Sequence, residues 1–208
     1  VLPRFTVAID SKEDAENIIH ELSKGSASLV KTFSKFDAEV LRHLLNKARE
    51  HGLPVTYDPG KPLFHSITID RGIDLGVRCF EHGPALWDAV LEDDLRSEHD
   101  DLLNEQADPK SRVAFMEKIF SLGFKSISPK KLEKLMDKMT QNSVYFCPTL
   151  HAFKYIANHP PEDIGKEQLG TYKRHVEVYD KISAFFTREM VRRGVKTLVG
   201  QDGFDAEF

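Results

Sequence analysis

Several polar residues lie in or directly after short apolar runs that are typical of strands. They are Lys31, Tyr57, Asp58, His82, His151 and Asp202. Active sites of α/β proteins are assembled outside the carboxyl ends of the strands, with several strands contributing. We therefore expect these side chains to converge at one rim of a sheet.

The residue types in this set suit a metal centre. A lysine inside an apolar strand costs several kcal/mol unless it is paired, neutralised or modified. Lys31, once deprotonated, could add carbon dioxide and become a carbamate whose two oxygens bridge cations. The imidazole of His82 and the carboxylates of Asp58 and Asp202 suit zinc or a similar divalent ion. A metal-activated water, with Asp202 as proton acceptor, would hydrolyse a substrate.

Each residue also has a structural explanation. Lys31 could extend its amine from a strand end to solvent. His82 before a glycine, and Asp58 before Pro59 and Gly60, both fit turns, and Asp202 fits a turn or a helix cap. His151 fits either the first turn of a helix or a substrate contact. Only the joint pattern favours a site, in which Tyr57 and His151 would bind substrate.

The elements that must position these residues alternate between strand and helix. Six strand-like runs begin at about residues 5, 27, 54, 77, 144 and 195, and helical sequence separates them. Ser11 followed by Asp14 resembles a capping box, and Asp37 is placed to cap a second helix that ends before Gly52. This order predicts an α/β fold with a parallel sheet. A helical insertion is expected at about 87–141.

Two architectures fit this order. A closed (β/α)8 barrel needs eight units and about 250 residues, whereas a doubly wound open sheet needs five or six strands. The count favours the open sheet, while the polar strand ends favour a barrel. An open sheet with a metal-free small-molecule site stays an alternative.

Composition excludes several classes of protein. The 208 residues include 40% hydrophobic and 30% charged residues, which is typical of one globular domain, here 1–208. The net charge of -4 predicts no nucleic-acid partner. No apolar run is long enough to cross a membrane. Two unpatterned cysteines fit the cytoplasm and would also survive in a periplasm, so the compartment stays open.

Several short motifs together resemble the amidohydrolase superfamily, with imidazolonepropionases and prolidase-like dipeptidases as the nearest subgroup. They are the stretch 25–31, the strand entry 52–55, the sequence 80–83, the sequence 148–150 and the stretch 194–202. The resemblance implies a (β/α)8 barrel present here from about its third to its eighth strand. It implies a carboxylated Lys31 bridging one or two zinc-like ions, His82 as a metal ligand, and Asp202 as ligand and general base.

The sequence departs from this family pattern in two places. The His-X-His of the family's first strand would precede Val1, so the chain is expected to begin in mid-fold and the barrel to be incomplete. A histidine is also expected at the position of Asp58, which could serve instead as an oxygen ligand. His65 is a second possible replacement.

The resulting hypothesis is a metal-dependent hydrolase of an amide, cyclic amide or dipeptide bond, with a small molecule or dipeptide as substrate. The competing hypothesis is a non-catalytic relative that has lost its metal and serves as a binding or structural protein. Exposed sheet edges would also be compatible with a homo-oligomer.

Overall fold

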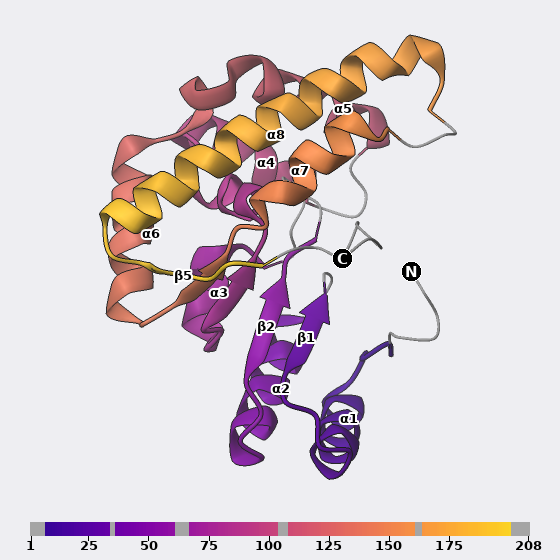
Figure 1. The fold of residues 1–208 in the computed structure, drawn as a ribbon, viewed down its shortest axis with the longest axis vertical. Helices are drawn as coiled ribbons and strands as arrows, with labels where there is room; N and C mark the ends of the chain where they lie inside the picture. The colour runs from indigo at the N-terminus through magenta and orange to yellow at the C-terminus, as the bar shows by residue number, and fades with distance from the viewer. Residues whose placement is uncertain (1–6, 34–35, 61–66, 104–107, 161–163, 201–208) are drawn as a thin grey trace.

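Short parallel strands form the centre of the molecule (Figure 1). The computed structural model describes residues 7–33, 36–60, 67–103, 108–160 and 164–200. Each strand pairs with the next one along the chain, so the sheet order is β1-β2-β3-β4-β5. The strands of the described part are β1 (Val30–Phe33), β2 (Val55–Asp58), β3 (Cys79–Glu81), β4 (Tyr145–Cys147) and β5 (Lys196–Thr197). The predicted α/β class is confirmed.

Helices precede the sheet and connect its strands. The α-helices are α1 (Lys12–Lys24), α2 (Ala38–Glu50), α3 (Ile69–Leu75), α4 (Asp93–Leu102), α5 (Pro109–Leu122), α6 (Pro129–Gln141), α7 (Leu150–Asn158) and α8 (Lys166–Arg192). Short 3-10 helices are η1 (Gly83–Leu86), η2 (Asp88–Val90) and η3 (Gly123–Ser126). Among the described residues, none of these helices has the length and apolar character that a membrane span requires.

The first two helices begin at the residues that the sequence indicates. The hydroxyl oxygen of Ser11 accepts a hydrogen bond from the backbone N–H of Asp14 at 3.1 Å. The carboxylate of Asp37 accepts from the N–H groups of Glu39 and Val40 at 2.8 and 3.2 Å. These contacts satisfy amides that a helix start leaves without partners. Both predicted caps are confirmed.

The strand predicted near residue 5 is not found where the chain can be described. Residues 7–10 have no regular secondary structure, and residues 1–6 lie outside the described part. Val7 is 66% exposed, so most of its surface faces solvent. An alternating apolar run therefore does not suffice to make a strand here.

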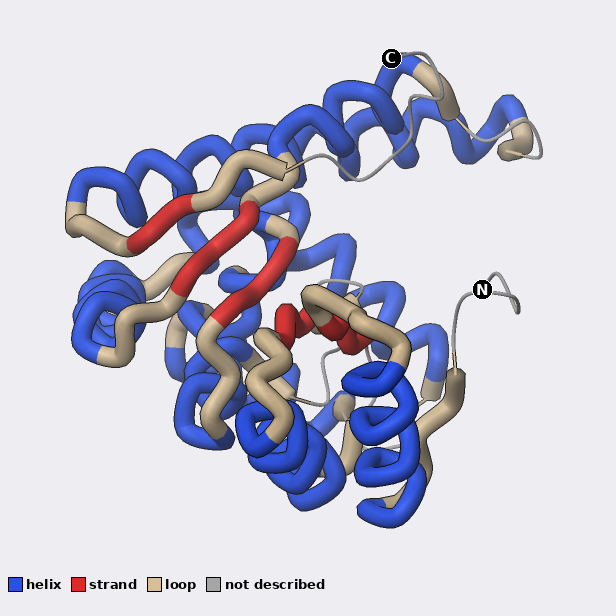
Figure 2. Tube along the Cα trace, turned by 60° about the horizontal axis from the view of Figure 1, so that its bottom comes forward, coloured by secondary structure: helices blue, strands red, loops and turns tan. Residues whose placement is uncertain are grey.

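The strand order places the helices against one face of the sheet. Right-handed crossovers that always advance in the same direction leave their helices on the same side. Figure 2 shows the strands inside a curved layer of helices. Side chains alternate between the two faces along a strand. Tyr57, Phe80 and Phe146 are fully buried in the core, whereas Lys31 and Glu81 belong to the opposite face.

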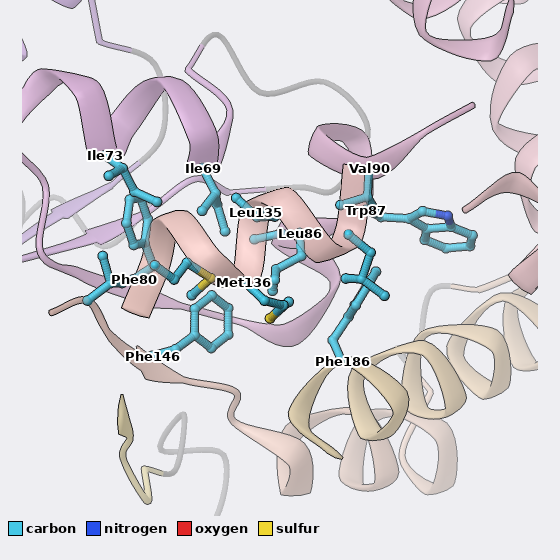
Figure 3. Close-up of a cluster of buried hydrophobic side chains, with 14 of the residues drawn as sticks. Ile69, Ile73, Phe80, Leu86, Trp87, Val90, Leu135, Met136, Phe146 and Phe186 are labelled. Atoms are coloured by element: carbon cyan, nitrogen blue, oxygen red, sulfur yellow. The ribbon is translucent and has the colours of Figure 1, made fainter. Parts of the chain in front are cut away.

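The helical insertion between β3 and β4 contributes much of this core. Trp87 is fully buried, and its indole N–H donates a hydrogen bond to the hydroxyl of Ser126 at 2.8 Å. Met136 of α6 and Phe186 of α8 are also fully buried and belong to the same cluster (Figure 3). The stretch at about 87–141, which the sequence predicts to be a helical insertion, contains α4, α5 and α6. This packing fixes the far end of β3, where the polar residues lie.

Gly83 sits where α8 approaches the end of β3 most closely. A Cβ atom at Gly83 would lie 2.6 Å from Ser183 Cβ and 2.9 Å from Ser183 Cα. We expect Gly83→Ala to lower the free energy of unfolding by about 1–3 kcal/mol, because a packed core cannot take the extra methyl group. Urea unfolding measures this change.

Gly170, also in α8, supplies the matched control. A Cβ atom at Gly170 would have no heavy atom within 4 Å. Gly170→Ala should raise the free energy of unfolding by roughly 0.5–1 kcal/mol, because alanine is the better helix former. Equal effects of the two substitutions would show that the approach at Gly83 is not tight.

Candidate metal centre

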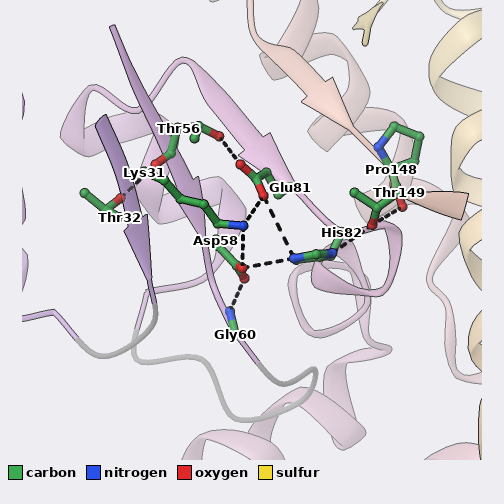
Figure 4. Close-up of polar contacts among 9 residues, drawn as sticks. All are labelled: Lys31, Thr32, Thr56, Asp58, Gly60, Glu81, His82, Pro148 and Thr149. Carbon is green, nitrogen blue, oxygen red and sulfur yellow. Dashed lines mark hydrogen bonds and ion pairs between the residues drawn. The ribbon is translucent and has the colours of Figure 1, made fainter. Parts of the chain in front are cut away.

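Four charged or ionisable side chains meet at the carboxyl ends of β1, β2 and β3 (Figure 4). The ammonium group of Lys31 lies 2.6 Å from Glu81 Oε2 and 3.4 Å from Asp58 Oδ2. The ring of His82 places Nε2 2.9 Å from Asp58 Oδ2 and 4.0 Å from Glu81 Oε2. We call Lys31, Asp58, Glu81 and His82 the strand-end cluster.

The sheet register explains why these residues meet. Lys31 pairs with Thr56 across β1 and β2, so Asp58 lies two residues further on the same face. Glu81 ends β3, and the pairing of Tyr57 with Phe80 aligns Asp58 with Glu81. Side chains one strand apart on the same face are direct neighbours. Lys31 therefore reaches across β2 to a carboxylate two strands away.

Hydrogen bonds hold both carboxylates in place. Asp58 Oδ1 accepts from the backbone N–H of Gly60 at 2.9 Å, which leaves Oδ2 for Lys31 and His82. Glu81 Oε1 accepts from the Thr56 hydroxyl at 3.0 Å, which leaves Oε2 for Lys31. Each carboxylate thus presents one oriented oxygen to the centre of the cluster.

Burial and charge act in opposite directions on Asp58. The residue is only 2% exposed, and burial by itself raises the pKa of its carboxyl group. The hydrogen bond and charge of His82, the Gly60 amide and the charge of Lys31 outweigh burial, so the pKa lies below its ordinary value. Asp58 is therefore ionised at neutral pH and available as a ligand.

The cluster fits a divalent cation. Asp58, Glu81 and His82 each offer a ligand atom, and these atoms lie within 4.8 Å of one another. Two carboxylates and an imidazole are ligands that zinc and similar ions accept. Among the residues that the structure describes, no other group of three or more such side chains comes this close.

The structure brings three of the sequence-predicted residues together and places two others elsewhere. Lys31, Asp58 and His82 belong to the strand-end cluster. Tyr57 is fully buried on the helix-covered face, with its ring in an edge contact with Phe80, so it does not reach the rim where substrate would bind. His151 is exposed in the first turn of α7.

Asp202 and His65 lie outside the described residues. The described chain reaches Gly200, where a Cβ atom would overlap the Cys147 sulfur. The segment that leads toward Asp202 therefore passes the carboxyl end of β4.

Glu81 and Thr149 are the residues that sequence reasoning missed. Glu81 directly precedes His82, and a lysine within an apolar strand signals the need for a carboxylate nearby. Thr149 carries no such signal. Its hydroxyl lies 2.8 Å from His82 Nδ1, although the two residues are 67 positions apart.

The two free cysteines report on the charge of the cluster. Burial raises the pKa of the Cys79 thiol, and the negative charge of Glu81 raises it further against the opposing effect of Thr56. We expect Glu81→Gln to lower this pKa and to speed the reaction of Cys79 with a thiol reagent in a Cys147→Ser background.

Glu133 provides the control for this measurement. Its carboxylate is exposed and pairs with Arg193, outside the strand-end cluster. Glu133→Gln should leave the rate at Cys79 unchanged. If Glu81→Gln leaves the reaction rate of Cys79 as it is in the Cys147→Ser protein, the charge of Glu81 has no effect on the pKa of this thiol.

Comparison with solved structures identifies proteins of similar fold at low sequence identity. An uncharacterized protein matches with a TM-score of 0.59 and 15% identity, over 95% of this chain and 40% of its own. Ochratoxinase of A. niger matches with a TM-score of 0.58 and 10% identity, over 93% of this chain and 35% of its own. A bottromycin amidohydrolase matches with a TM-score of 0.53 and 13% identity, over 97% of this chain and 43% of its own. The chain thus spans less than half the length of each structure.

No family model matches the sequence, and no curated protein matches it either. The structural likeness therefore establishes the fold. It is an α/β fold with a parallel sheet, similar to the folds of ochratoxinase and the bottromycin amidohydrolase.

Proposed function

We propose that the protein is a metal-dependent hydrolase that cleaves an amide, cyclic amide or dipeptide bond. The observation that carries this proposal is the strand-end cluster, in which an imidazole and two oriented carboxylates converge on one point. The fold shared with ochratoxinase and a bottromycin amidohydrolase supports the reaction class. The name of the second denotes amide hydrolysis.

We further propose that the sheet is part of a (β/α)8 barrel. In a doubly wound sheet the strand order reverses and helices cover both faces, whereas here the order β1-β2-β3-β4-β5 never reverses. The face that carries the strand-end cluster would then line the interior of a barrel. The neighbours' greater lengths agree with a larger whole.

Each residue of the cluster has a role in this proposal. Asp58, Glu81 and His82 would hold the metal, which when bound supplies a nucleophilic water at neutral pH and polarises the scissile carbonyl. Asp202 would accept the proton from the water, as the sequence pattern suggests. His151, exposed at the start of α7, would contact the substrate. Tyr57 has no part, because it is buried in the core.

Lys31 would change its charge when the metal binds. As an ammonium ion it forms ion pairs with Glu81 and Asp58. A divalent cation at the same carboxylates would repel it, which favours loss of its proton. The neutral amine could then add carbon dioxide and become a negatively charged carbamate that supplies a further ligand. Zinc is the ion that we favour for such a nitrogen and oxygen set.

Metal analysis tests this function directly. We expect about one to two equivalents of zinc or a similar ion in protein purified without chelator, or after reconstitution with divalent ions and bicarbonate. The loaded protein should hydrolyse members of a panel of dipeptides and cyclic amides, and chelation should remove the activity. Protein that stays metal-free after reconstitution contradicts the proposal.

A second candidate function rests on Lys31. Its ammonium group already forms an ion pair with each of the two carboxylates without a metal. This arrangement favours a non-catalytic binding protein in which a lysine replaces the cation. A wild-type protein that binds no metal, and whose free energy of unfolding is the same with and without chelator, would support this candidate.

A further inference from the structure

Two neighbouring residues of the site adopt a backbone conformation that is unfavourable for their type. His82 has φ +66° and Thr149 has φ +48°, both in the left-handed region. A residue other than glycine in this region costs about 1–3 kcal/mol and persists only where its surroundings hold it. The surroundings of His82 and Thr149 therefore hold both residues in place.

Backbone hydrogen bonds hold these two segments side by side. The N–H of His82 donates to the carbonyl oxygen of Cys147 at 2.9 Å, and the N–H of Gly83 donates to that of Pro148 at 3.1 Å. Thr149 follows directly, and its hydroxyl meets the His82 ring (Figure 4). Thr149 is only 4% exposed, so water does not compete for this contact.

The direction of this hydrogen bond follows from counting protons. Thr149 has one hydroxyl proton, and it donates this proton to the Pro148 carbonyl oxygen at 2.9 Å. The Thr149 oxygen is therefore an acceptor toward His82, so Nδ1 of the ring carries a hydrogen. Nε2 also carries a hydrogen here, because the ionised carboxylate of Asp58 accepts from it at 2.9 Å. A divalent cation would replace that hydrogen while Nδ1 keeps its bond to Thr149, so Nε2 is the nitrogen that can coordinate a metal.

We propose that Thr149 is a positioning residue that fixes the ring orientation of His82 and its Nδ1–H form, and so reserves Nε2 for a divalent cation. The inference rests on the proposed function. In metal sites the second ring nitrogen of a histidine ligand commonly donates to an oxygen, which orients the ring and makes the ligand a stronger donor. Here the acceptor is a hydroxyl whose own proton is held by a backbone carbonyl.

The geometry at Nε2 agrees with this assignment. Nε2 lies 2.9 Å from Asp58 Oδ2 and 4.0 Å from Glu81 Oε2, so it faces the carboxylates with which it would share the cation. A ring turned by half a rotation would direct carbon atoms toward Thr149 and Asp58. The Thr149 hydroxyl therefore selects one of two orientations.

Three threonine variants test the proposal through zinc affinity, measured by competition with a chromogenic chelator. We expect Thr149→Val, which keeps the branched shape and removes the hydroxyl, to bind Zn²⁺ about 10- to 100-fold more weakly. Thr149→Ser restores the hydroxyl and should recover affinity to within about threefold of wild type. Thr140 also donates its hydroxyl to a carbonyl, that of Met136 in α6, so Thr140→Val is the control without effect.

Nitrogen-15 NMR of the histidine rings gives a second readout that needs no activity. The sequence has nine histidines, and a His82→Gln spectrum identifies the signals of His82. We expect a proton on His82 Nδ1 that is protected from exchange in the wild-type and Thr149→Ser proteins. This protection should be lost in Thr149→Val, whereas a merely structural role of Thr149 would leave it unchanged.

The two readouts separate failure of this inference from failure of the proposed function. Wild-type affinity in a folded Thr149→Val protein overturns the inference and leaves the metal site standing. A wild-type protein that binds no Zn²⁺ overturns the proposed function and, with it, the role of Thr149 toward a metal. In that case a protected Nδ1 proton still supports the hydrogen bond itself, and an unprotonated Nδ1 overturns it.

Discussion

Asp58→Asn is expected to abolish tight metal binding and, with it, hydrolysis. The amide keeps the size of the carboxylate but loses its charge, and only one of its ends can accept a hydrogen bond. Its oxygen can serve either the Gly60 amide or the groups now at Oδ2, so at least one contact is lost. Zinc affinity should fall by more than the roughly 10- to 100-fold that loss of an outer-shell partner costs.

The control for Asp58→Asn is the same change at Asp74. The Asp74 carboxylate forms an ion pair with Lys138, with 2.7 Å between Asp74 Oδ2 and Lys138 Nζ. Its side chain is 67% exposed and lies outside the strand-end cluster. Asp74→Asn should bind zinc and turn over substrate like the wild type. Urea unfolding of both variants separates loss of a ligand from loss of the fold. A folded Asp58→Asn protein with full zinc affinity would remove Asp58 from the metal site.

Lys31→Arg is expected to produce the second large effect. Arginine keeps the positive charge and can pair with Glu81, but it stays protonated and cannot add carbon dioxide. If a carbamate completes the metal site, metal loading in the variant no longer responds to bicarbonate. Turnover should then fall by at least about 100-fold, because a ligand of the metal is missing.

This variant also separates the two candidate functions. In the non-catalytic candidate Lys31 serves only as a cation, so Lys31→Arg should keep the stability of the wild type in chelator. Lys138→Arg is the matched control, since Lys138 pairs with Asp74 in a similar ion pair. Wild-type turnover of Lys31→Arg would show that no carbamate forms at this position.

Local patterns predicted the elements of the fold well. Ser11 and Asp37 cap their helices because short side-chain oxygens satisfy amides that any helix start leaves unpaired, and this chemistry is readable over four residues. Five of the six strand-like runs form strands, because their apolar residues pack against helices. These runs can also be recognised over a few residues. In the run near residue 5, the described residues from Val7 onward form no strand, and Val7 is mostly exposed.

The site was only partly readable, because its contacts depend on register and backbone conformation. The alternation of side chains along β2 places Tyr57 on the face opposite to Asp58, so the two could not both line one rim. Glu81 required knowledge that β1 and β3 flank β2. The contact of Thr149 with His82 depends on the positive φ angles of both residues, and these angles have no signature in a single sequence.

The consecutive strand order also has a consequence for synthesis on the ribosome. Each strand pairs with one already made, so the sheet can grow by one unit at a time without waiting for distant sequence. Lys31 is made before Asp58 and Glu81, and a positive charge is thus in place when each carboxylate arrives. Thr149 follows more than sixty residues later. The contact between Thr149 and the His82 ring therefore forms only when β4 docks, after the other residues of the strand-end cluster have been made.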